Sequence, residues 1–397
     1  MKKDNKYILV ILFLLLFAVF YLLLKVIPAD YNDMHDHAAF ARDMCIGKIP
    51  YTGNFLVYLL VNVFSFFTAG VKATELSLCG LLAFAGTYRY YLVFDKISTE
   101  LIADSPPKTN QPLNPLTNRL SAQVASLAML FVFVIPIPGY FTDDRYMYIG
   151  SFTPNVWHNS TILFLFPFAM LLFEQSWKQL QTFNIKRNGW ILLLITLNLF
   201  IKPSFFFVFI CVYPLMLLYK YKFGKMFWLS LIPVFLGGVL LIFQYIIIYK
   251  INTQVIKDTS SVIFMPFWKN PELKEDMINI PISMIFSLLF PLTYTALNFN
   301  KLKNSQLFWY TLLTFIVSVL IFFFISESGP RASHGNFYWQ IVITTWLCFF
   351  TALLGLLKDF KTGGRSVKNI ILLFLFGIHT VIGIVYLAKI LFTGSYY

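Results

Sequence analysis

The sequence predicts an all-α polytopic membrane protein: one domain over residues 1–397, with about 11 transmembrane helices and juxtamembrane helices in its first external loop. Hydrophobic residues make up 58% of the chain and charged residues only 12%, about half the roughly 25% charge of a water-soluble domain. Mean hydropathy is +0.71. Apolar runs near the roughly 20 residues that cross a bilayer core recur along the chain. This composition excludes soluble enzymes, nucleic-acid-binding proteins and disordered chains, and four cysteines without a pattern form no disulfide framework.

The predicted spans are apolar runs bounded by charged, polar or proline residues. The first, 7–27, begins after a basic N-terminus and has no small-residue cleavage site before Pro28. We therefore expect a retained helix in place of a cleaved signal peptide. The later spans are predicted at 75–94, 120–138, 158–176, 188–201, 204–219, 226–249, 281–299, 307–325, 337–357 and 368–392.

The stretch 53–71 is long enough to span, but it can also lie in the membrane interface. Asn54, Tyr58, Asn62 and Ser65 recur in it at helical spacing and define a polar side. The distribution of Lys and Arg decides between the two arrangements. With 53–71 interfacial and the N-terminus in the cytoplasm, most basic residues, Arg89 included, fall on the cytoplasmic side. We therefore predict eleven spans, with the C-terminus outside.

The parts outside the membrane are short. We predict a first external loop at 28–74 with juxtamembrane helices, a proline-rich cytoplasmic linker at 95–119, and an external loop at 250–280. No GxxxxGK[ST] motif occurs, which disfavours an ATP-driven pump.

Ionisable residues gather in the predicted external segments, without a matching set inside. Asp30, Asp33, Asp36 and His37 directly follow the first span at helical spacings. Later external segments add further polar candidates: Asp143, Asp144, Asn155, His158, Lys202, Glu327, Arg331 and His334. Each also has a structural explanation, as a solvated loop, a turn, a helix cap or a snorkelling lysine. Together they indicate an active site open to the outer leaflet.

Such a set suits transfer from a phosphate-bearing lipid. A carboxylate can take a proton from an attacking hydroxyl, while Arg and Lys stabilise a departing phosphate. By charge and side we assign Lys202, Arg331 and His334 to the donor phosphate, and Asp30, Asn155, His158 and Glu327 to substrate contacts. Asp and His ligands suit Mg²⁺ or Mn²⁺. The spacing does not require a metal, so the metal question stays open.

Residues 32–44, NDMHDHAAFARDM, resemble the D-E-x-x-Y-x-x-x-A-R-E-M stretch of bacterial aminoarabinose and related transferases in the GT-C superfamily of glycosyltransferases. Residues 47–51 with the 53–71 helix resemble the second juxtamembrane helix of that family. Glu75 opens the second span, where members often carry an acidic residue. The motif match covers about 50 residues. Met34 departs from it by replacing an acidic residue, whose role Asp36 and His37 would share.

The resemblance implies a polyprenyl-phosphate sugar donor, an inverting reaction, and Asp33 as the catalytic base. Asp143 or Asp144 would be the second acidic contributor. We therefore expect a glycosyltransferase of the bacterial inner membrane that moves a sugar to a glycan or lipid of the cell envelope on the external face. Membrane lipids are its expected surroundings and nucleic acid is no expected partner.

Two other functions remain open. An O-antigen-type polymerase or ligase would take a diphosphate-linked glycan and would centre on Arg331 and His334. A transporter or flippase of lipid-linked glycans usually carries charge deep within its spans and inverted repeats. The spans here are nearly free of charge and no repeat is evident, which favours an enzyme.

Overall fold

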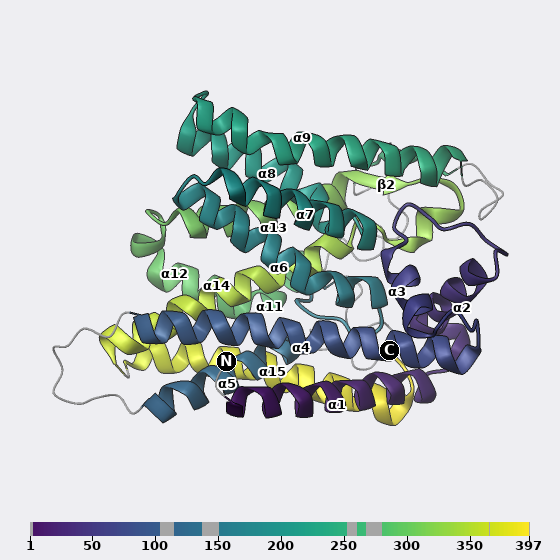
Figure 1. The fold of residues 1–397 in the computed structure, drawn as a ribbon. Coiled ribbons are helices and arrows are strands. Elements are labelled where there is room, and N and C mark those ends of the chain that lie inside the picture. Colours follow the sequence, from purple (N-terminus) through teal and green to yellow (C-terminus); the bar gives the residue numbers. More distant parts are fainter. Residues whose placement is uncertain are drawn as a thin grey trace.

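The computed structural model describes residues 3–103, 115–136, 151–251, 260–266, 280–364 and 366–396. These residues form fourteen α-helices and one short two-stranded sheet. The long helices lie side by side, and the two short helices α2 (Asp33–Cys45) and α3 (Leu56–Phe64) gather with strand β2 at one end of the bundle (Figure 1). We call this end the α2 end.

The remaining helices account for the apolar runs of the sequence. They are α1 (Lys3–Val26), α4 (Val71–Ala103), α5 (Pro115–Phe131), α6 (Ser160–Gln181), α7 (Ile185–Ile201), α8 (Ser204–Tyr221), α9 (Lys225–Ile246), α11 (Ile280–Ser287), α12 (Leu289–Leu302), α13 (Gln306–Phe324), α14 (Trp339–Gly363) and α15 (Val367–Thr393).

Among the described residues, seven helices are long and apolar enough to cross a membrane, and an eighth span results if α11 and α12, bent by 74°, act as one. The protein is thus a multi-pass membrane protein by helix length and composition. Every predicted span contains a helix or this bent pair, but the span predicted at 120–138 is helical only to Phe131; residues 132–136 are not helical, and 137–138 lie outside the described residues. Three of the eleven predicted spans, those in α4, α5 and α7, do not meet this criterion of length and apolar composition. Helix α4 carries several charged residues, whereas α5 and α7 have only 17 residues each.

The two ends of the chain lie toward opposite ends of the bundle (Figure 1). Gly394, just after α15, lies against Val26 at the end of α1, where an added Cβ would be 2.4 Å from the Val26 carbonyl oxygen. The N-terminus lies a full helix length away from that point. This arrangement fits an odd number of membrane crossings.

Helix α3 is too short to cross a membrane, so the non-spanning prediction for 53–71 is correct. Its nine residues rise about 14 Å, less than half of the roughly 30 Å hydrocarbon core. Its polar side packs against protein and not against headgroups. Asn62 is fully buried and donates from Nδ2 to the Ala41 carbonyl of α2 at 2.9 Å and to the Tyr51 hydroxyl at 2.9 Å.

Two predictions about the α4 region need correction. The linker predicted over 95–119 is helical at both ends, since α4 continues to Ala103 and α5 begins at Pro115; residues 104–114 lie outside the described residues. Arg89 is not cytoplasmic but buried, and donates to the Asn155 Oδ1 and the Leu130 carbonyl at 3.2 Å each. The positive-inside rule uses only the position of a basic residue along the chain. It therefore missed Arg89, which buried hydrogen-bond acceptors hold inside the bundle.

A short antiparallel sheet joins two of the predicted external segments, which lie far apart in the chain. Strand β1 (Val262–Phe264) pairs antiparallel with β2 (Ile325–Glu327), with Val262 opposite Glu327. Within the predicted 250–280 loop, residues 252–259 and 267–279 lie outside the described residues. The pairing holds Glu327 at the α2 end, where its side chain is almost completely buried.

Helix α15 meets the end of α5 at a glycine that tolerates no side chain. A Cβ on Gly383 would lie 1.5 Å from the Phe131 carbonyl oxygen, and the adjoining Phe133 N–H donates to the His379 carbonyl at 3.0 Å. We expect Gly383→Ala to lower the free energy of unfolding by about 1–3 kcal/mol or more through this overlap. Gly377→Ala in the same helix is the control, because nothing lies within 4 Å of its Cβ position. Thermal unfolding in detergent tests the pair, and equal melting temperatures would contradict the close packing.

Candidate functional site

The start of α2 fixes the position of the first acidic residue of the candidate site. Asn32 caps the helix by accepting the Met34 N–H at 3.1 Å, and its Nδ2 donates to the Leu23 carbonyl of α1 at 3.3 Å. The cap thus ties the beginning of α2 to the end of α1. Asp33 occupies the first position of α2, where a negative charge interacts favourably with the helix dipole.

Asp33, His37 and Tyr58 form a connected polar group. Asp33 Oδ2 lies 3.2 Å from His37 Nε2, and His37 Nδ1 lies 2.8 Å from the Tyr58 hydroxyl. Asp33 Oδ2 is buried and has no hydrogen-bond partner among the described residues, so its approach to His37 is one of distance and charge. The hydroxyl of Tyr58 stays protonated because burial, and then the charge of Asp33, raises its pKa. A chain of contacts thus runs from Tyr58 through His37 to the Asp33 carboxylate.

Two further ionisable groups from distant parts of the chain act on Asp33. Burial raises the pKa of this carboxyl, but His37, and then His158 and Lys202, outweigh burial and lower the pKa to about 2. His158 precedes α6 and Lys202 separates α7 from α8, so three stretches of chain meet here. Asp33 remains partly exposed, although Oδ2 itself is buried. It is therefore an ionised, accessible carboxylate at neutral pH.

Lys202 lies at the break between α7 and α8. It is the C-cap of α7, and Pro203 precedes the first residue of α8, so the main chain is not helical where this side chain emerges. The ammonium group lies 5.2 Å from the centre of the Trp339 ring, and the residue is buried. Burial lowers the pKa of Lys202 to about 8 although Asp33 and Glu327 oppose this. Lys202 is thus a buried cation on which the charges of two carboxylates act.

His158 and Asn155 differ in their surroundings. The His158 ring is buried against Trp339 and Tyr396, with ring centres 5.5 Å and 4.9 Å away. Burial lowers its pKa to about 4 against the opposing charge of Asp33, so His158 is neutral near pH 7. Asn155 faces the interior, where its Oδ1 accepts from Arg89 and its Nδ2 donates to the Leu130 carbonyl. The substrate contact predicted for Asn155 is therefore replaced by a structural role.

A cavity of about 460 Å³ adjoins this group. Lys202 and Arg331 both line it, together with Asn54, Asn336 and apolar side chains of α9. Glu327 anchors the polar side of this region: it accepts hydrogen bonds from the Tyr249 hydroxyl and, at 2.6 Å, from Asn336 Nδ2. Arg331 NH1 lies 3.9 Å from Glu327 Oε1. Two cations thus border one cavity beside a buried carboxylate.

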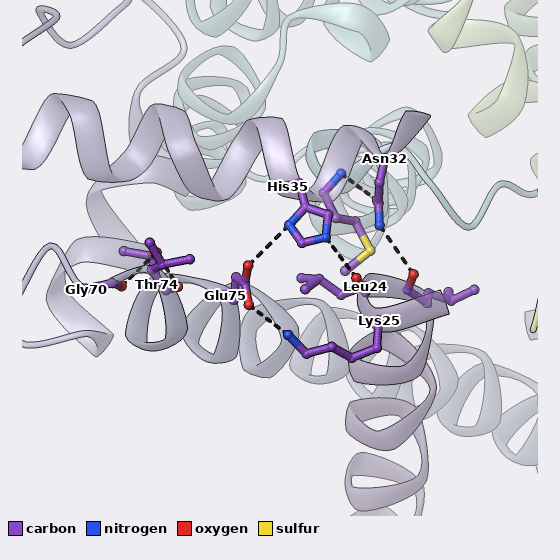
Figure 2. Close-up of polar contacts among 10 residues, drawn as sticks. Leu24, Lys25, Asn32, His35, Gly70, Thr74 and Glu75 are labelled. Carbon is purple, nitrogen blue, oxygen red and sulfur yellow. Dashed lines mark hydrogen bonds and ion pairs between the residues drawn. The ribbon is translucent and has the colours of Figure 1, made fainter. Parts of the chain in front are cut away.

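A second polar network ties α2 to α1 and α4 (Figure 2). Glu75 of α4 lies 3.2 Å from His35 Nδ1 and 3.3 Å from Lys25 Nζ, and His35 Nε2 lies 2.8 Å from the Leu24 carbonyl. The network holds α2 through the two ring nitrogens of His35, which lies two residues after Asp33. Glu75 therefore supports the position of α2, whereas the sequence only marked it as opening a span.

The remaining predicted residues are not brought into this group. Asp36 and Asp30 are exposed; burial, followed by the charge of Asp33, raises the pKa of Asp36. Asp143 and Asp144 lie outside the described residues. His334 ends the short helix over Gly329–His334, and its side chain is outside the description. His379 is a buried packing residue, with Nδ1 2.6 Å from the Phe133 carbonyl.

Sequence reasoning missed several residues that complete the site. Tyr58 was recognised only as part of a polar side, although it contacts His37. Tyr249 and Asn336 both donate to Glu327; Tyr249 gave no signal because it lies 78 residues before Glu327, whereas Asn336 lies only nine residues after it. The polar spacing within α3 was the one pattern that could have identified Tyr58.

The described residues contain no group of three or more His, Cys, Asp or Glu side chains placed to hold a metal ion. Comparison with known proteins adds no assignment: no family model, no curated protein and no solved structure matches the chain.

Proposed function

We propose that the protein is a membrane glycosyltransferase that moves a sugar from a polyprenyl-phosphate donor to a cell-envelope acceptor, with inversion. The observation that carries this proposal is the cavity that Lys202 and Arg331 both line, together with the interaction between the charges of Lys202 and Asp33. One carboxylate free to accept a proton and two cations beside an apolar-walled cavity match the needs of such a transfer.

In this proposal the donor phosphate binds between Lys202 and Arg331. Lys202 supplies a point charge and Arg331 a planar fork of donors, which suits a phosphate that gains negative charge as it leaves. The apolar α9 side of the cavity, which includes Leu241 and Ile248, offers a surface for the first part of the lipid chain. Glu327 holds Arg331 in place and takes no part in proton transfer.

Asp33 acts as the general base. The acceptor hydroxyl gives its proton to the Asp33 carboxylate while its oxygen bonds to the anomeric carbon, and the bond from that carbon to the phosphate oxygen breaks. His37 and Tyr58 orient the carboxylate. A carboxyl with a pKa of about 2 is a weak base, so its charge also stabilises positive charge that develops on the sugar.

The same proposal places the protein in a bacterial inner membrane, with eleven crossings, a cytoplasmic N-terminus and the α2 end outside. The charge distribution of the connecting turns supports this orientation. Accessibility of an introduced cysteine at Asp36, compared with one at Lys186, tests it in intact cells. Labelling of Lys186→Cys but not Asp36→Cys by an impermeant maleimide would reverse the orientation.

Product analysis tests the function. Purified protein is incubated with a polyprenyl-monophosphate sugar, a diphosphate-linked oligosaccharide, or liposomes that report flipping. We expect a covalent glycoside from the monophosphate donor only. A product from the diphosphate donor would support the polymerase or ligase, and transport without product would support the flippase. Buried Arg89 is a feature typical of a transporter, yet its contacts are Asn155, a main-chain carbonyl and aromatic rings.

The lowered pKa of Lys202 predicts the alkaline side of the pH profile. Its ammonium form is present below pH 8 and is lost as the pH rises through about 8. Because kcat/KM reports the free enzyme, we expect kcat/KM to fall about tenfold for each pH unit above 8. Lys202→Arg should remove this decline, since Arg stays charged. A wild-type profile that is flat from about pH 7 to pH 10 would contradict a role for this charge.

A further inference from the structure

A larger cavity, of about 750 Å³, lies in the half of the bundle away from α2. Helices α4, α6, α11, α12, α13 and α14 contribute its walls, and most lining side chains are apolar. The volume falls within the roughly 300–1,000 Å³ of ligand sites. None of the residues assigned above to sugar transfer lines it, so the cavity is independent of the proposed function.

Charged side chains lie at only one end of this cavity. Glu100 Oε2 lies 2.7 Å from Lys358 Nζ and Glu100 Oε1 lies 3.3 Å from Lys96 Nζ, so two ammonium groups share one carboxylate. Lys301 also lines this end and pairs with Asp359 at 2.6 Å. Glu174 lines the cavity as well and pairs with Lys178 at 2.8 Å, so four ammonium groups face three carboxylates and one positive charge is left in excess. Trp177, a residue type common at membrane interfaces, lies there too.

The apolar length of the cavity matches one leaflet. Along α14 the lining runs from Leu347 to Lys358, a rise of about 16 Å, close to half of a roughly 30 Å hydrocarbon core. The bend of 74° between α11 and α12 places both helices in the same wall. An apolar wall one leaflet deep with a basic end has the dimensions and charge of a lipid site.

We propose that this cavity binds an anionic phospholipid of the leaflet opposite the α2 end. Its acyl chain would lie against α12, α13 and α14, and its phosphate would lie at Lys96, Lys301 and Lys358. Apolar surface inside a membrane favours a hydrocarbon chain over water, and each basic residue near the headgroup level adds attraction for an anionic lipid. Zwitterionic lipids fit the apolar wall equally well but lack the net charge that the basic end selects.

Native mass spectrometry of the full-length protein tests the site. The protein is reconstituted in phosphatidylcholine bilayers that contain phosphatidylglycerol, and the retained lipid is identified after release. We expect wild-type protein to retain phosphatidylglycerol in preference to phosphatidylcholine. In the triple variant Lys96→Gln, Lys301→Gln, Lys358→Gln, the ratio of retained phosphatidylglycerol to phosphatidylcholine should fall at least fivefold. The control variant Lys186→Gln, Lys220→Gln, Lys225→Gln removes equal charge from exposed positions and should keep it.

Thr351→Trp provides a second test that leaves every charge in place. Thr351 lines the cavity on α14, so a tryptophan there should fill the apolar wall and reduce phosphatidylglycerol retention while the protein still folds. Equal retention of the two lipids by wild-type protein would overturn the proposal. So would an equal loss of preference in the control variant, or full retention in Thr351→Trp, because each would indicate unspecific surface lipid.

Discussion

Asp33→Asn is expected to reduce sugar transfer by about 10²- to 10⁴-fold, the contribution typical of a general base. The substitution keeps the shape and the acceptor oxygen that faces His37 but removes the negative charge. Folding should change little, because Asp33 is partly exposed and the cap of α2 is Asn32. The measurement is kcat with a polyprenyl-phosphate sugar, with circular dichroism and thermal unfolding of the same preparation.

Asp36→Asn is the matched control for this prediction. Asp36 lies in the same helix, three residues later, but its side chain is exposed. Transfer by Asp36→Asn should stay within about threefold of wild type. Near-normal transfer by Asp33→Asn, or an equal loss in both variants, would remove Asp33 from the mechanism.

Lys202→Met is expected to cause the second largest loss, about 10²- to 10³-fold in kcat/KM, because one donor to the leaving phosphate disappears from a buried site. Lys202→Arg should retain a larger share of activity, since it keeps the charge. The control is Lys220→Met, an exposed lysine in the last turn of α8. If Lys202 serves only to pack against Trp339, kcat/KM of Lys202→Met should remain near wild type, and that outcome would contradict phosphate binding.

Much of the fold follows from the sequence because helix formation in a membrane depends mainly on local apolar runs. Each such run contains a helix, and α3 is too short to span, as predicted. Length and composition alone give seven or eight spans among the described residues, since α4 is long but charged and α5 and α7 are short. Arg89 was misplaced because its buried partners, Asn155 and Leu130, come from other parts of the chain.

In the candidate site too, local patterns predict some contacts, whereas others depend on how distant helices pack. The pair Asp33 and His37 follows from the i, i+4 spacing of a helix, and the structure brings them within 3.2 Å. The same spacing argument also included Asp36, whose side chain is exposed in the structure. The approach of Lys202 to Asp33 depends on how α7, α8 and α2 pack, which no local pattern encodes.

A cryo-electron microscopy structure of the protein with a non-cleavable phosphonate analogue of a polyprenyl-phosphate sugar tests the central claim most directly. We predict that the phosphonate oxygens lie within hydrogen-bond distance of Lys202 and Arg331, and that the anomeric carbon of the sugar faces Asp33. Density for the phosphonate away from both cations, or a sugar that lies on the far side of the bundle from Asp33, would contradict it.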